Sequence, residues 1–201
     1  MAVGVVAYGL GNLGSVMNML KRVGVEARLV STPDEVAHCD RVLLPGVGAF
    51  DEGMRLLGER GLDDAVRDFA AAGRPLFGIC LGMQLLLDRS EEGEASGLGL
   101  IAGESLRFDE SSGLRVPHMG WNTISPTRAD ALTHGLDADS RFYFVHSYRV
   151  VPSHPDVTIA TTSYGVDFAS MIRKDNVMGA QFHPEKSHAF GMTILRNFAS
   201  L

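Results

Sequence analysis

Among the residues of this sequence, a cysteine between two glycines has the neighbours that most favour a reactive side chain. In PLFGICLGMQLL, residues 75–86, Cys80 follows an apolar run and precedes a segment with helical spacing, and Gly78 and Gly82 flank it. The G-x-C-x-G spacing is typical of a nucleophile elbow, a tight strand-to-helix turn that exposes one side chain at the edge of a sheet. A helix start there would favour a thiolate, and the backbone N–H of Leu81 could face an oxyanion. A buried structural cysteine beside packing glycines is the alternative.

The base for such a thiol must come from elsewhere in the chain, and His183 is a candidate with a carboxylate beside it. His183 follows the apolar run VMGAQF, and Glu185 stands two residues further on. Residues i and i+2 of an extended chain face the same side, so Glu185 could orient the imidazole while its other nitrogen faces Cys80. The alternatives are a surface histidine at a strand end and an acidic residue in the first turn of a helix. No Cys or His pair has a convincing metal-ligand spacing, so we expect no metal.

A third segment, LLPGVGAF at residues 43–50, also follows an apolar run and has glycines on both sides of Val47. Such a loop at the same edge of a sheet could present backbone N–H groups to a reacting carbonyl. A plain turn between a strand and a helix is the alternative interpretation.

These segments need an α/β scaffold, and the hydrophobic pattern indicates one. Apolar runs alternate with amphipathic segments in the first half, which predicts a parallel sheet covered by helices. Strands are expected at 3–8, 25–30, 41–45 and 75–79, and helices at 13–24, 51–73 (broken near Gly58 and Gly61) and 81–88. In the second half we expect antiparallel or mixed strands at 99–107, 142–151, 157–162, 167–173 and 177–182, and a last helix at 187–199. No linker or repeat interrupts the pattern, so residues 1–201 are expected to form one domain.

Composition narrows the class of protein. The 201 residues carry a formal net charge of −6 with no block of Lys and Arg, which argues against a nucleic-acid partner. No apolar run approaches the roughly 20 residues that span a bilayer, so we expect no membrane association. The chain has only two cysteines, Cys39 and Cys80, and no basic N-terminal start, so a reducing cytoplasm is the expected location.

The N-terminal stretch AYGLGNLGSV has the spacing G-x-G-x-x-G of a dinucleotide-binding turn. That site also needs an acidic residue at the end of the second strand. The expected strand 25–30 is instead followed by Ser31, Thr32 and Pro33. We therefore interpret the glycines as a tight turn before a helix that Asn12 or Ser15 caps, and expect no cofactor.

Taken together, GICLGMQLL, FHPE and PGVG resemble the motifs of class I, or triad, glutamine amidotransferases. PGVGAF, VPHMGWN (116–122), FYFVHSY (142–148) and FHPEKS (182–187) resemble most closely the branch formed by the glutaminase subunits of imidazole glycerol phosphate synthase. The resemblance covers nearly the whole chain and implies a flavodoxin-like fold, with a mostly parallel central sheet flanked by helices and added antiparallel strands. The first loop departs from the family pattern at Ala7, which is often acidic, and at Gly14, which is often basic or polar.

The resemblance implies a role for each matching residue. Cys80 would be the nucleophile, His183 the base and Glu185 the residue that orients it. Leu81 and the loop residues Gly46, Val47 and Gly48 would bind the oxyanion. Recognition of glutamine maps onto Gly48, Gln84, Glu92, His146, Ser147 and Tyr148, although Glu92 could also be a solvated acid in the run SEEGE.

A partner is implied as well, namely a (β/α)₈-barrel cyclase subunit that would form a heterodimer with this chain and receive the ammonia. The interface candidates are Trp121, Tyr143, Lys186 and Asn12, with a core position as the alternative for Trp121. The isolated chain is expected to have low activity, because the oxyanion loop would wait for the ligand of the partner.

Three other readings remain open from the sequence. One is a glutaminase subunit of another synthase, such as that of pyridoxal phosphate or anthranilate synthesis, although PGVG and HMGWN disfavour it. A peptidase or stress-response hydrolase with the same elbow is the second. A non-catalytic binding module is the third, and it would leave Cys80, His183 and Glu185 without a use.

Overall fold

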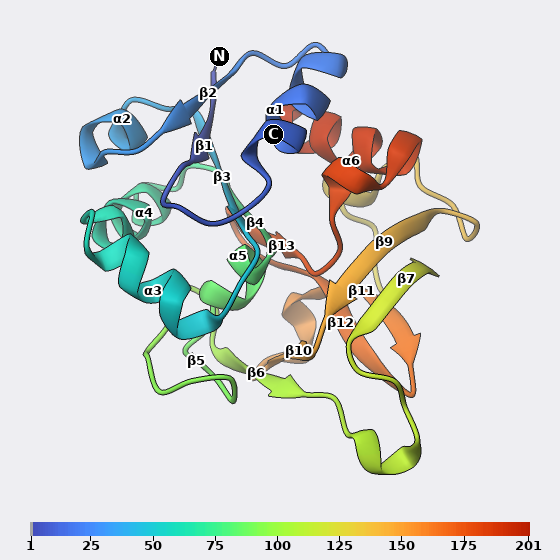
Figure 1. Cartoon of the computed structure of the whole chain (residues 1–201). Helices are drawn as coiled ribbons and strands as arrows, with labels where there is room; N and C mark the ends of the chain where they lie inside the picture. The colour runs from blue at the N-terminus through green and yellow to red at the C-terminus, as the bar shows by residue number, and fades with distance from the viewer. Residues whose placement is uncertain (1) are drawn as a thin grey trace.

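A computed structural model describes residues 2–201 of the chain, and its centre is a mixed β-sheet (Figure 1). Within those residues eleven strands form this sheet, whose main path runs β2-β1-β3-β4-β13-β12-β10-β6-β5, while a separate antiparallel pair joins β7 and β9. The strands of the first half are β1 (Val3–Val6), β2 (Ala27–Val30), β3 (Arg41–Gly46), β4 (Leu76–Cys80) and β5 (Arg89–Ser90). Those of the second half are β6 (Gly103–Arg107), β7 (His118–Thr123), β8 (Ser125–Pro126), β9 (Arg141–His146), β10 (Tyr148–Pro152), β11 (Thr158–Tyr164), β12 (Val166–Lys174) and β13 (Val177–Ala180).

Helices cover both faces of the parallel strands. They are α1 (Leu13–Arg22), α2 (Pro33–Ala37), α3 (Phe50–Gly58), α4 (Leu62–Ala71), α5 (Leu81–Leu85) and α6 (His188–Ser200). Figure 1 shows α1 and α6 on one side of the sheet and α2, α3 and α4 on the other. Strand β1 contributes side chains to the cores on both faces of the sheet. Val5 packs in the core beside α1 and α6, and Val6 packs in the core of the opposite face. Two buried clusters therefore hold the sheet between its layers of helices.

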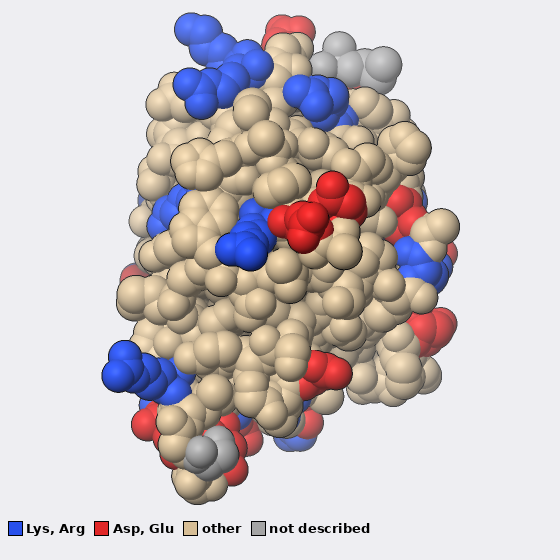
Figure 2. Space-filling view, turned by 90° about the vertical axis from the view of Figure 1, so that its right-hand side faces the viewer, with Lys and Arg blue, Asp and Glu red and all other residues tan. Residues whose placement is uncertain are grey.

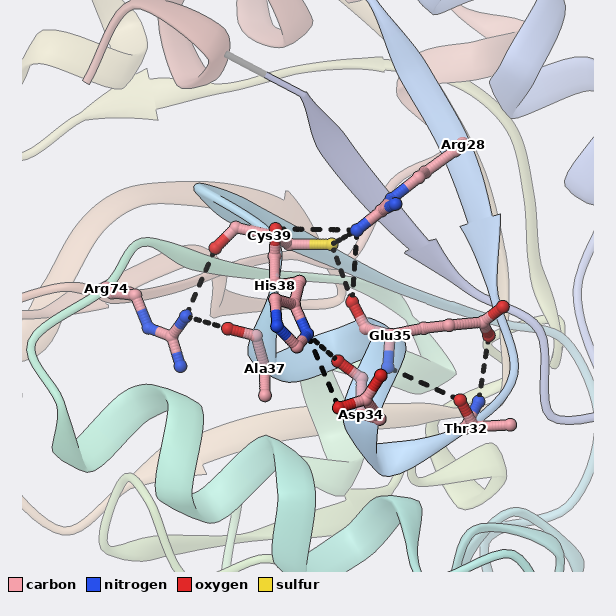
Figure 3. Close-up of polar contacts among 8 residues, drawn as sticks. All are labelled: Arg28, Thr32, Asp34, Glu35, Ala37, His38, Cys39 and Arg74. Atoms are coloured by element: carbon pink, nitrogen blue, oxygen red, sulfur yellow. Dashed lines mark hydrogen bonds and ion pairs between the residues drawn. The ribbon is translucent and has the colours of Figure 1, made fainter.

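Helix α2 has only five residues, and hydrogen bonds at both of its ends stabilise it (Figure 3). The Thr32 hydroxyl accepts a hydrogen bond from the Glu35 N–H at 3.3 Å, and the Glu35 carboxylate accepts one from the Thr32 N–H at 3.1 Å. At the other end of the helix, Arg74 donates to the Ala37 carbonyl at 2.7 Å. This capping box and C-terminal contact satisfy backbone groups that a five-residue helix would leave exposed.

Three neighbouring parallel strands, β3, β4 and β13, carry the segments of chemical interest. Gly46 lies opposite Cys80 in the register of β3 and β4, and Ala180 lies opposite Ile79 in the register of β13 and β4. The chain leaves each of these strands at the same edge of the sheet. The loop after β3, the turn after β4 and the segment after β13 are therefore neighbours.

The predicted α/β class with added antiparallel strands is confirmed, and so is the break between two helices near Gly58 and Gly61. Three expectations about elements are wrong. Residues 142–151 are not one strand, because the chain passes from the β7–β9 pair into the main sheet at Ser147. Of the expected strand 99–107, only Gly103–Arg107 is extended, since the backbone N–H groups of 99–101 donate to the carbonyl groups of Leu86 and Leu87, directly after α5. The expected helix 81–88 ends at Leu85.

Candidate active site

Cys80 is held in a strained turn between β4 and α5. Its backbone has φ 55° and ψ −110°, a conformation that L-residues rarely adopt and that functional sites often contain. The glycines around it are required by close approach: a Cβ at Gly82 would lie 1.8 Å from the Leu44 carbonyl oxygen, and one at Gly78 would lie 2.5 Å from the Gly82 carbonyl oxygen. The spacing G-x-C-x-G thus lets the helix pack directly on the strands while the cysteine side chain stands at the turn.

His183 and Glu185 form a buried pair on the segment that follows β13. The imidazole Nδ1 lies 2.8 Å from the Glu185 Oε1 atom, and the two side chains are 1% and 2% exposed. The Ser187 hydroxyl donates to the His183 carbonyl at 2.6 Å and accepts from the Tyr143 N–H at 3.0 Å, which fixes this segment against β9. The pair therefore has one geometry, in which Glu185 orients the ring.

The protonation of His183 follows from its neighbours. Burial lowers the pKa of His183, but the Cys80 thiol and the Glu185 carboxylate outweigh burial and raise that pKa to about 9. Among the described residues the Nε2 atom of His183 has no hydrogen-bond partner, so its interaction with Cys80 is looser than a closed hydrogen bond. Catalytic hydrogen bonds are often open in this way before substrate binds.

One cavity of about 230 Å³ contains Cys80 and the residues expected to recognise glutamine. From the predicted set, the residues that line it are Val47, Gly48, Leu81, Gln84, Glu92, His146, Ser147 and Tyr148. Gly46 lies at the end of β3, opposite Cys80, and His183 and Glu185 lie outside the lining. The structure thus brings the predicted nucleophile, oxyanion loop and recognition residues together.

Two polar side chains of the cavity are fixed by backbone groups. The Glu92 carboxylate accepts from the Phe50 N–H at 2.8 Å, and burial raises the pKa of Glu92 although this hydrogen bond opposes the rise. The Gln84 amide donates to the Tyr148 carbonyl at 3.2 Å. A carboxylate and an amide at fixed positions in one small cavity suit a substrate that carries both an ammonium group and an amide.

Gln181 belongs to this site and was not expected from the sequence. Its side chain is fully buried, its Oε1 accepts from the Gln84 amide at 3.2 Å, and its Nε2 lies 3.9 Å from the Cys80 Sγ atom. The signal was present, because Gln181 precedes His183 by two residues and follows β13, the strand beside β4.

Three of the four predicted interface residues lie around the β7–β9 pair and the end of η4 (Pro184–Lys186). Trp121 is 48% exposed, so the alternative that it is a core residue is wrong. Its ring stacks on the ring of His188, with 5.3 Å between the ring centres. The Lys186 ammonium lies 5.6 Å from the ring centre of Tyr143. Asn12 caps α1, where its side-chain oxygen accepts from the Ser15 N–H at 3.3 Å. Figure 2 shows the side of the molecule with β7, β9 and α6, where mainly uncharged surface surrounds a basic and an acidic group that lie together near the centre.

Residues 2–201 contain no group of three or more His, Cys, Asp or Glu side chains arranged to hold a metal ion. No helix in the same range is long and apolar enough to cross a membrane.

A cysteine elbow with an oriented histidine directly after the neighbouring parallel strand is the arrangement of a cysteine-dependent hydrolytic site on an α/β fold. Comparison with known proteins narrows this class. The model of the family "Glutamine amidotransferase class-I" matches residues 5–200, and the chain belongs to that family.

Individual relatives point to one branch of the family. The imidazole glycerol phosphate synthase subunit HisH 2 of Pseudomonas aeruginosa is 47% identical over 198 residues, covering 98% of both chains. The subunit HisH of Moorella thermoacetica is 46% identical over 200 residues, covering 99% of this chain and 94% of that protein. The solved structure of PurLQS from Thermotoga maritima shares the fold, with a TM-score of 0.77, 20% identity and coverage of 99% and 97%. The resemblance to glutaminase subunits of imidazole glycerol phosphate synthase is therefore confirmed.

Proposed function

We propose that this chain is the glutaminase subunit of a cytoplasmic imidazole glycerol phosphate synthase in histidine biosynthesis. It hydrolyses glutamine to glutamate and ammonia, and it passes the ammonia to a (β/α)₈-barrel cyclase subunit in a heterodimer. The observation that carries this proposal is the single cavity that joins Cys80 in its strained turn to Gln84, Glu92 and the segment 146–148. The HisH relatives, which cover nearly the whole chain, support the choice of synthase.

In the proposed mechanism the Cys80 Sγ atom attacks the side-chain amide carbon of glutamine. His183 holds the proton that the thiol gives up and passes it to the departing nitrogen, so that the C–N bond breaks and ammonia leaves with a thioester on Cys80. A water molecule then loses a proton to His183 and attacks the thioester, and glutamate departs as Cys80 regains its proton. The raised pKa of His183 keeps its proton available for the leaving group near neutral pH.

The negative oxygen of each tetrahedral intermediate needs hydrogen-bond donors at fixed positions. We assign the Leu81 N–H to this role, together with an N–H from the loop 46–48 after some rearrangement. The exposed Val47 and the left-handed Gly48, with φ 140°, give this loop the freedom to rearrange, while Gly46 is anchored in β3. The Glu92 carboxylate faces the α-ammonium group of glutamine, and Gln84, His146, Ser147 and Tyr148 surround the remainder.

A partner follows from the chemistry of the product. Ammonia released into water near neutral pH becomes mostly ammonium, which is not a nucleophile, so a docked acceptor subunit prevents its loss. We place the docking surface at Trp121, Tyr143, Lys186 and Asn12. Three of them lie around the β7–β9 pair and the segment that carries His183, and Asn12 starts α1, which contacts η4.

The test is glutamate release from glutamine by the chain alone and by its complex with the cognate cyclase subunit and the nucleotide ligand of that cyclase. We expect low activity for the isolated chain, strong stimulation in the complex and no glutamate from the complex with Cys80→Ala. No glutamate under either condition would remove the proposed function. Equal activity with and without the cyclase would remove the partner from it.

A further inference from the structure

Two buried histidines, His118 and His146, lie side by side at the glutamine cavity. They face one another in the register of β7 and β9, with exposed fractions of 3% and 6%. The Nδ1 atom of His118 is 3.0 Å from the Nε2 atom of His146. His146 lines the cavity, whereas His118 lies outside the lining and contacts His146.

The direction of every hydrogen bond around this pair can be derived. The Nδ1 atom of His146 lies 2.8 Å from the Tyr148 carbonyl oxygen, which can only accept, so Nδ1 carries the proton. Burial lowers the pKa of His146 to about 3, so this ring is neutral and its Nε2 must accept. The donor to Nε2 is therefore the Nδ1–H of His118.

The same reasoning extends to β7. Burial lowers the pKa of His118 to about 4, so its Nε2 has no proton and accepts from the Asn122 amide at 3.3 Å. The orientation of that amide is fixed, because its Nδ2 also donates to the Ser163 carbonyl at 3.0 Å and its Oδ1 accepts from the Thr123 N–H at 2.9 Å. One chain of hydrogen bonds thus runs from Asn122 through both histidines to the Tyr148 carbonyl.

The end of this chain is a part of the glutamine cavity. The Tyr148 carbonyl accepts from the His146 ring and from the Gln84 amide, and the latter bond is 3.2 Å long. Gln84 and Tyr148 both line the cavity. The His146 ring therefore helps to hold two recognition groups, beside Gln181, which accepts from Gln84, and the pairing of Tyr148 with Arg107 on β6.

The surroundings of His118 offer no substitute for its hydrogen bonds. Its ring lies in a stack with Phe144 at 4.7 Å and Tyr164 at 4.0 Å, and Phe108 and Phe168 approach it edge-on. If His118 lost its donor, the Nε2 atom of His146 would be a buried acceptor among aromatic rings, which is unfavourable. His146 would then rotate to find another partner.

We propose that His118 is a positioning residue for glutamine binding, which acts by donating a hydrogen bond to His146 and so fixing the Tyr148 carbonyl and Gln84. This inference rests on the proposed glutaminase function. His118 itself touches neither substrate nor reacting atoms.

Two variants separate this role from packing, measured by glutaminase kinetics of the complex with the cyclase and its nucleotide ligand. His118→Phe keeps an aromatic ring in the stack but has no donor. His118→Asn loses the ring but places an amide N–H near the position of Nδ1. We expect His118→Phe to raise the KM for glutamine about tenfold with a smaller change in kcat, and His118→Asn to remain nearer to wild type. If His118 acted only by packing, His118→Asn would be more damaging than His118→Phe. The damage would then appear as a lower melting temperature and not as a higher KM.

An unchanged KM in His118→Phe, or an equal rise in both variants, would overturn the positioning role while leaving the glutaminase in place. No glutamate from the wild-type complex would overturn both. A measurement that needs no activity tests the hydrogen-bond chain directly, namely long-range ¹H–¹⁵N correlation of the histidine rings in the full chain near neutral pH. We expect the Nδ1–H tautomer at both His118 and His146, and the Nε2–H tautomer at either would overturn the proposal.

Discussion

The pKa of His183 is set by two residues from different elements. Cys80 ends β4, Glu185 lies in the segment after β13, and together they raise the pKa of His183 to about 9 although burial lowers it. A pKa raised by folding means that the folded state holds the proton more tightly. The stability gained from this is complete below the unfolded value of about 6.5 and is lost as the pH rises through about 9.

The substitution Glu185→Gln tests this account of His183. It removes one cause of the raised pKa while leaving a group that can still accept from Nδ1. We expect the alkaline limb of the kcat/KM profile to move to lower pH by about one unit, and kcat to fall by about 10²–10⁴-fold. The melting temperature of the wild type should exceed that of the variant by less at high pH than at pH 6.

Glutamate release as a function of pH is the measurement, and Glu94→Gln, at an exposed glutamate, is the matched control. The control should leave the profile unchanged. An alkaline limb that stays in place in Glu185→Gln would contradict the role of the carboxylate, even if kcat falls.

Helix α5 and strand β3 pack so closely beside Cys80 that only glycine fits between them. A Cβ at Gly82 would lie 1.8 Å from the Leu44 carbonyl oxygen, a backbone atom that cannot move without disturbing the sheet. We expect Gly82→Ala to lower the free energy of unfolding by more than about 3 kcal/mol. Gly14 in α1 is the matched control, since a Cβ there meets nothing within 4 Å and its φ is not left-handed.

Gly14→Ala should raise the free energy of unfolding by about 0.5–1 kcal/mol, because alanine favours the helix. Urea unfolding of the isolated chain measures both variants. A loss below about 1 kcal/mol in Gly82→Ala would mean that the elbow can relax and that the glycine has another purpose.

The elements that the sequence predicted well are those with strong local patterns. The continuous apolar runs became the parallel strands β1, β3 and β4, and the elbow motif located Cys80 at a strand-to-helix turn. Elements that depend on pairing were not predictable in the same way. The strand β7 has no clear alternation of apolar residues and forms because it pairs with β9 over six residues.

The segment 142–151 shows why part of the site also escaped prediction. Its composition is that of one strand, but the chain changes sheets at Ser147, and no local pattern marks the change. This change brings His146 and Tyr148 beside the cavity and sets His118 against His146. Gln181 was missed for a related reason, since its neighbours Gln84 and Cys80 are 97 and 101 residues away in the sequence.

Across the whole molecule, the exposed apolar side chains of the β7–β9 pair stand near the segment that carries His183 and Glu185. Met119 and Trp121 are 62% and 48% exposed, and β9 contacts η4, which contains Glu185. Exposed aromatic and Met side chains that lie close together favour contact with another protein. A cyclase docked there would cover the β7–β9 pair next to the histidine and carboxylate of the site.

The substitution Trp121→Ala tests the location of this surface. We expect it to weaken binding of the cyclase by about 10- to 100-fold, because tryptophan is often a dominant contact residue, and to change the melting temperature little, because half of the side chain is already in solvent. Leu29→Ala is the matched control: Leu29 is also 48% exposed, but it lies on β2 at the far end of the sheet. Isothermal titration of the cyclase into each variant measures the affinity.

Equal affinities for Trp121→Ala and the wild type would exclude this face as the docking site. A loss of affinity in Leu29→Ala as large as that in Trp121→Ala would show that the effect is not local to β7. If binding weakens only in Trp121→Ala, the cyclase should also stimulate glutamate release less in this variant, since a smaller fraction of the chain is bound to the cyclase at the same concentration.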